Sequence, residues 1–84
     1  MQLYRICLLS HPSGDHMDLR ADVVEDFFTL GTSFYEARKK VVRKVKNSSH
    51  YDIACFLIDK LPLGVTPEQA LEVLRVVGVL KVID

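Results

Sequence analysis

The residues best suited to chemistry in this sequence form a dense run of cations. Six of the eleven basic residues lie between positions 38 and 46: Arg38, Lys39, Lys40, Arg43, Lys44 and Lys46. Such a cluster steers anionic partners towards itself, so it fits an acidic protein surface or a nucleic acid. A plainer interpretation is a solvated helix face whose charges partly neutralise a neighbouring acidic helix. The formal net charge of +0 argues against a protein dedicated to coating DNA.

Zinc-ligand residue types are present, but they are not arranged as a known zinc site. They are His11, Asp15, His16 and His50, with Cys7 and Cys55, and their spacing matches no finger or ribbon. Both cysteines lie in apolar runs, where a free thiol behaves as a small hydrophobe. The sequence also lacks a phosphate-binding glycine loop and a serine nucleophile elbow. We therefore predict a protein that is not an enzyme and that uses no metal or cofactor.

Length and composition set the class of protein. With 84 residues, 49% hydrophobic and 26% charged, the chain suits one globular domain over residues 1–84. The first residues lack the features of a signal peptide, and no run approaches the roughly 20 apolar residues of a membrane span. Two cysteines do not form a disulfide framework. We expect a complete small protein located in the cytoplasm, with no membrane contact.

The expected elements begin with a strand over residues 3–9. Arg5 interrupts its apolar run, which indicates either an edge strand or a side chain whose stem lies along the sheet. A helix over residues 18–30 follows, with Leu19, Val23, Phe27 and Leu30 at helical spacing and Gly31 at its end.

A second helix over residues 33–46, capped by Thr32 or Ser33, carries the basic cluster. Residues 51–58 form a strand that is apolar on both faces, which is typical of a central strand. Thr66, Pro67 and Gln69 predict a capping box at the start of a helix over 67–77, and residues 79–83 form the last strand. The expected fold is α/β (α+β), a two-layer β-α-α-β-α-β sandwich with three strands and three helices on one face.

The helix over 67–77 is apolar on most of its sides. Val73 and Val76 remain apolar although Leu71, Leu74 and Val77 already supply a buried stripe. A helix of this kind is either deeply buried or part of an interface, so we also expect a homodimer or docking to a larger protein.

The order of elements resembles the fold shared by ClpS-type protease adaptors and the C-terminal domain of the bacterial ribosomal stalk protein. The resemblance involves residues 4–9 as the first strand, Met17 before the first helix, Val23, Val24, Phe27 and Phe28 within it, Glu36, Ala37, Arg38 and Val41 in the second helix, and Gly64, Val65, Thr66, Glu68 and Ala70 near the third. It implies a scaffold for docking proteins. His11 and Pro12 stand where the adaptors place an Asn-Asp pair, so capture of a free amino terminus is not implied.

These observations together predict a small non-enzymatic adaptor or regulatory subunit, similar in type to the ClpS adaptors. It would bind an acidic protein through the six clustered cations, with His11, His16 and Met17 as further contact residues. The alternative is a small nucleic-acid-binding protein that uses the same basic patch. That alternative is weakened because no aromatic residues are interleaved with the cations as stacking platforms.

Overall fold

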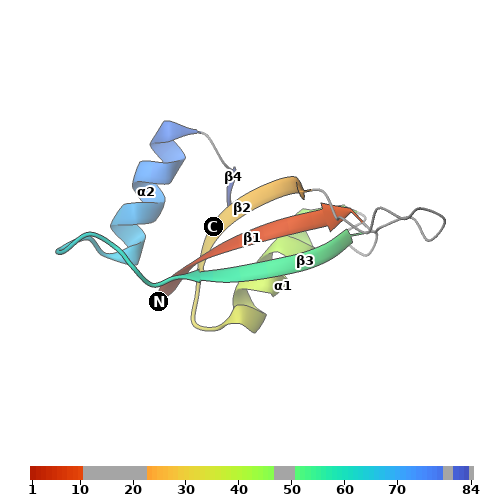
Figure 1. Cartoon of the computed structure of the whole chain (residues 1–84), viewed down its shortest axis with the longest axis horizontal. Helices are drawn as coiled ribbons and strands as arrows, with labels where there is room; N and C mark the ends of the chain where they lie inside the picture. Colours follow the sequence, from red (N-terminus) through yellow and green to blue (C-terminus); the bar gives the residue numbers. More distant parts are fainter. Residues whose placement is uncertain (11–22, 47–50, 79–80, 84) are drawn as a thin grey trace, which may run out of the picture.

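The computed structural model describes residues 1–10, 23–46, 51–78 and 81–83. Its elements are β1 (Gln2–Ser10), β2 (Val23–Gly31), α1 (Phe34–Lys44), β3 (Tyr51–Ile58), α2 (Pro67–Val77) and β4 (Lys81–Ile83). The strands form one mixed sheet in the order β3-β1-β2-β4 (Figure 1). β1 is antiparallel to both its neighbours, and β4 joins β2 in parallel. The expected fold of three strands and three helices is therefore wrong: the described chain has a four-stranded sheet and two helices.

The largest correction concerns the helix expected over 18–30. Residues 23–31 form β2, and residues 18–22 lie outside the described part of the chain. The segment is rich in valine, phenylalanine and threonine, which favour strands. Its pairing with β1 satisfies its backbone and buries Phe27 and Thr29. Tertiary pairing thus overrides a helical spacing that involved only four apolar residues.

The strand order also differs from expectation. β1 lies in the middle of the sheet, so the edge position suggested by Arg5 is wrong. β3 was expected to be central and instead forms an edge of the described sheet, where it pairs with β1 alone. The strand expected over 79–83 is present as β4 in its described part.

One face of the sheet forms the main core against α1. Alternate residues of β1 point to this face because side chains alternate along a strand. The buried cluster comprises Tyr4, Ile6, Leu8, Phe27, Ala37, Val41 and Ile83. Ile53, Cys55 and Leu57 of β3 pack against it. The basic helix is therefore held by Ala37 and Val41, and its remaining sides face away from the sheet.

The opposite face contacts α2 at one end. Leu3, Phe28 and Ile58, which point away from α1, line an apolar groove with Val73 and Leu74 of α2. The two helices therefore do not lie on one face, as Figure 1 also shows, because α1 lies under the strands and α2 stands at the other side of their end.

The ends of both helices follow the expected local signals. Ser33 caps α1 by accepting a hydrogen bond from the Glu36 amide at 3.2 Å. The capping box between Thr66 and Gln69 is confirmed, with bonds of 2.9 and 3.1 Å, and Gly78 ends α2 in the left-handed conformation. The last strand is held to β2 by Thr29, whose hydroxyl donates to the Ile83 carbonyl at 2.7 Å.

Gly31 ends β2 where the chain turns into α1. A Cβ at this position would lie 3.2 Å from the Ala37 amide nitrogen and 3.3 Å from the Ser33 carbonyl oxygen. Those neighbours are backbone atoms that cannot move aside easily. Glycine therefore lets the strand end directly against the first turn of the helix that carries the cations.

A charged cluster joins β1 to β2 on the face opposite α1. The Arg5 guanidinium donates two hydrogen bonds to Asp26, at 3.1 and 2.7 Å. The Cys7 thiol donates to the same carboxylate at 2.7 Å. The bonds from Arg5 lower the pKa of Asp26 more than burial raises it. Charge compensation of this kind explains how an arginine can occupy the central strand.

We predict that Asp26→Asn lowers the free energy of unfolding by about 1–2 kcal/mol at pH 7, allowing for solvent screening at the half-exposed Arg5. Because the pKa of Asp26 is lower in the folded chain than in the unfolded chain, its contribution is complete above the unfolded value of about 4. It is lost as the pH falls through the folded value. The difference between wild type and variant should therefore shrink on acidification, measured by urea unfolding between about pH 2 and pH 7.

Asp59→Asn, at an exposed carboxylate after β3, serves as the matched control. It should change the free energy of unfolding by less than about 0.5 kcal/mol. A difference between Asp26→Asn and wild type that stays constant across this pH range would contradict the role assigned to the Arg5–Asp26 pair.

Candidate functional site

The outward side of α1 brings cations and two apolar side chains together. Tyr35, Arg38, Lys39, Val42 and Arg43 line a shallow cleft of about 330 Å³. Their spacing of three or four residues places them on one side of the helix. Tyr35 is 71% exposed, and the Lys39 ammonium lies 5.8 Å from the centre of its ring. We call these five residues the α1 outer face.

The other predicted cations of α1 lie in different surroundings. Lys40 is half-buried, and its ammonium donates to the Leu30 carbonyl at 2.5 Å, so it ties α1 to the end of β2. Lys44 and Lys46 are exposed at the C-terminal end of the helix, where cations also interact well with the helix dipole. The six cations predicted as one patch therefore divide into three groups.

The acidic neighbour expected for this helix does not exist in the described structure. Glu25 and Asp26 lie in β2 and pair with Lys81 and Arg5, at 2.8 and 2.7 Å. Asp15, Asp18 and Asp22 lie outside the described residues. Within the described ranges, no carboxylate forms an ion pair with Arg38, Lys39 or Arg43. The positive charge of the α1 outer face is thus directed to solvent.

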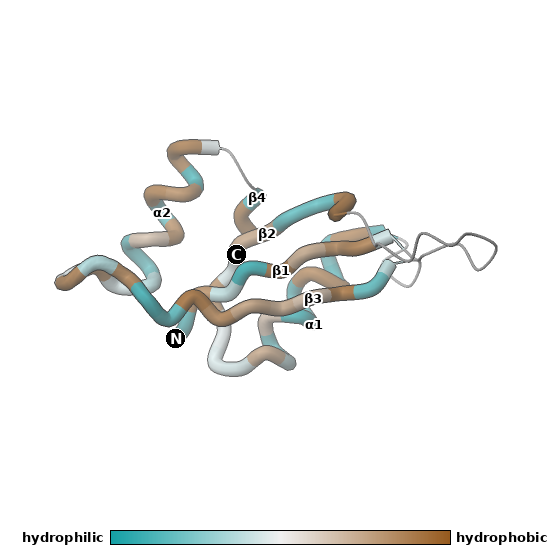
Figure 2. The backbone as a smooth tube through the Cα atoms, viewed as in Figure 1, coloured by the Kyte–Doolittle hydropathy of each residue, from teal (hydrophilic) through white to brown (hydrophobic). Residues whose placement is uncertain are grey.

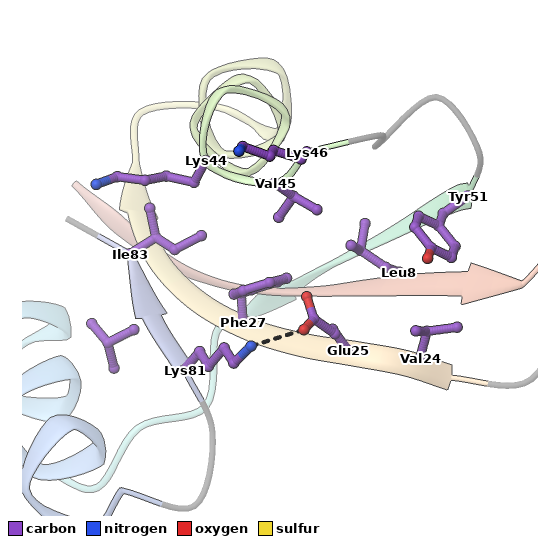
Figure 3. Close-up of a pocket in the computed structure, with 11 residues that line it drawn as sticks. Leu8, Val24, Glu25, Phe27, Lys44, Val45, Lys46, Tyr51, Lys81 and Ile83 are labelled. Atoms are coloured by element: carbon purple, nitrogen blue, oxygen red, sulfur yellow. Dashed lines mark hydrogen bonds and ion pairs between the residues drawn. The ribbon is translucent and has the colours of Figure 1, made fainter.

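A larger cavity lies under the C-terminal end of α1, beside β2 and β4. It has a volume of about 670 Å³. Figure 3 shows Phe27 and Val45 facing its interior and the Lys81–Glu25 ion pair at its lower side. Lys44 and Lys46 lie at its upper side, on the segment that carries Val45. The cavity extends the basic surface around the end of the helix.

The two cysteines are unsuited to nucleophilic catalysis. Burial raises the pKa of Cys7 to about 11, and its hydrogen bond to Asp26 acts in the same direction. Burial also raises the pKa of Cys55. Because a thiol must ionise to attack, both groups are weak nucleophiles at neutral pH.

The cysteines also cannot share a metal ion. Cys7 pairs with Ala54, whereas Cys55 pairs with Ile6, so the two thiols point to opposite faces of the sheet. The described residues contain no group of three or more potential ligands. His11, His16, Met17 and His50 lie outside the described part of the chain, so their predicted roles are not placed.

Tyr35 is the site residue that the sequence-based interpretation overlooked. Its spacing of three and four residues from Arg38 and Lys39 was the available signal. Figure 2 compares the hydropathy of the elements: α1 contains several hydrophilic stretches, whereas β3 is hydrophobic along most of its length. Because the Tyr35 ring lies beside Lys39, the expectation that no aromatic residue stands among the cations is corrected.

No helix in the described part of the chain is long and apolar enough to cross a membrane.

Searches of protein-family models, of curated proteins and of solved structures found no match to this chain. The resemblance to ClpS-type adaptors and the stalk domain is neither supported nor refuted by them, although the segment compared with their first helix is β2 here.

Proposed function

We propose that this chain is a small non-enzymatic adaptor or regulatory subunit that binds an acidic segment of another protein through the α1 outer face. The observation that carries the proposal is the exposed combination of Tyr35, Val42 and cations without carboxylate partners among the described residues. Tyrosine and arginine are enriched at protein interfaces, where an aromatic ring supplies buried area and arginine supplies directed hydrogen bonds.

The construction of α1 supports this use. Ala37 and Val41 are fully buried and hold the helix on the sheet, so the outer face can exchange contacts without disturbing the core. Acidic side chains of a partner would pair with Arg38, Lys39 and Arg43. An apolar side chain of the partner would cover Val42 and the Tyr35 ring. Lys44 and Lys46 would extend the attraction to the end of the helix.

The test is a charge reversal of four exposed cations, Arg38→Glu, Lys39→Glu, Arg43→Glu and Lys44→Glu. We expect loss of partner capture, because attraction becomes repulsion across the surface. The measurement is affinity purification from the native host with mass spectrometry. Circular dichroism should show an intact fold, since all four side chains are exposed.

The matched control exchanges the cations among themselves: Arg38→Lys, Lys39→Arg, Arg43→Lys and Lys44→Arg. It keeps the charge and the helix propensity, so most of the capture should remain. Equal recovery of the partners by the charge-reversed protein and the wild type would refute the α1 outer face as the binding surface.

A second candidate function is binding of single-stranded nucleic acid by the same face. The position of Tyr35 favours it, because an exposed aromatic ring among cations can stack on a base while the cations contact phosphates. Lys39 lies close enough to the ring to hold phosphate beside a stacked base.

For this candidate we predict that Tyr35→Ala weakens binding of a fluorescent single-stranded RNA by roughly tenfold, the cost of one lost stacking contact. Fluorescence anisotropy at low salt measures the affinity. Affinity should also fall steeply as salt is added, because binding is driven partly by release of cations from the phosphates and added salt reduces this gain. Phe34→Ala, at a similarly exposed ring that packs on Tyr4, is the control and should leave the affinity unchanged. Absence of binding at low salt would exclude this function.

A further inference from the structure

The cavity under the C-terminal end of α1 has an apolar base. Its volume of about 670 Å³ is within the range of small-molecule sites. Buried Leu8, Phe27 and Ile83 close the base. Val45 and Tyr51 are half-buried, so part of each side chain stays open to the cavity. The cavity therefore offers apolar surface at a point where the four strands of the described sheet and the end of α1 meet.

Charged side chains surround this apolar base, and most of them are cations. Among the described residues that line the cavity, three carry a positive charge and one carries a negative charge: Lys44, Lys46 and Lys81, with Glu25. Figure 3 shows Lys44 and Lys46 on the upper side of the cavity and Lys81 on the lower side. The Lys81 ammonium pairs with Glu25 at 2.8 Å and lies 5.8 Å from the centre of the Phe27 ring. Net positive charge thus lies close to the apolar surface.

We propose that this cavity binds a small organic anion with an aliphatic body, the chemistry of a medium-chain carboxylic acid. The aliphatic body would pack on Phe27 and Val45 and remove apolar surface from water. The acidic head group would lie at the rim, where the flexible stem of a lysine lets its ammonium follow the head group. An anion with a polar body, such as a sugar phosphate, suits the cavity less, because its hydroxyl groups would lie against the apolar base without hydrogen-bond partners.

The charges around the cavity favour an anion over a cation or a neutral molecule. The last carbonyl groups of α1 are equivalent to about half a negative charge, and Glu25 carries a full one. The three ammonium groups outweigh both. Glu25 also limits the attraction, because it compensates the charge of Lys81 within their ion pair. Removal of this carboxylate should therefore strengthen the binding of an anion.

Isothermal titration calorimetry of the whole chain with octanoate tests the site. We expect a dissociation constant below about 1 mM at roughly 0.15 M salt. 1-Octanol has the same chain without the charge, and acetate has the charge without the chain. Each should bind at least about tenfold more weakly, since the cavity recognises both parts of the ligand. Equal affinities for octanoate and 1-octanol would move the binding to the apolar groove beside α2 and overturn the proposal, as would no binding of octanoate up to about 10 mM.

Three variants connect octanoate binding to the cavity. Lys44→Ala with Lys46→Ala should raise the dissociation constant about tenfold, because two of the three lining cations are lost. The matched control, Lys60→Ala with Arg75→Ala, removes the same charge from exposed positions outside the cavity and should change the constant by less than about twofold. Glu25→Gln should lower the constant about threefold, a gain that damage to the fold could not produce. Equal effects of the two double variants, or a Glu25→Gln variant that binds no better than the wild type, would overturn the assignment.

Discussion

The central position of β1 is the constraint on which the rest of the structure depends. This strand is paired on both sides, and its side chains alternate between the face covered by α1 and the face that α2 contacts at one end. Tyr4, Ile6 and Leu8 form the floor for α1, while Leu3 on the other side contacts the groove beside α2. Arg5 can occupy such a strand only because Asp26 of β2 accepts two hydrogen bonds from it. The ion pair thus links the charge pattern of the sequence to the order of the strands.

The same arrangement explains why the charge of α1 is available to a partner. The acidic residues of β2 are engaged by Arg5 and by Lys81 of β4, on opposite faces of the sheet. They compensate cations of the sheet rather than those of the helix. A chain of zero net charge can therefore present a strongly basic surface, because its positive and negative groups are separated by the fold. Net charge alone therefore does not describe the charge of this surface.

Elements with local signals could be predicted from the sequence, whereas those set by pairing could not. The capping residues Ser33 and Thr66 located both helices, since their hydrogen bonds form within a few residues. β2 was missed because Leu19, Val23, Phe27 and Leu30 also fit a helical period, and only pairing with β1 decides between the alternatives. The basic run was found, but its division by Lys40 and the contribution of Tyr35 depend on which side of α1 faces the sheet.

The wrong position expected for β3 has a physical explanation. A strand that is apolar on both faces normally has neighbours on both sides, yet this one has a single neighbour among the described strands. Packing on α1 accounts for Ile53, Cys55 and Leu57, but not for the exposed Phe56 on the other face.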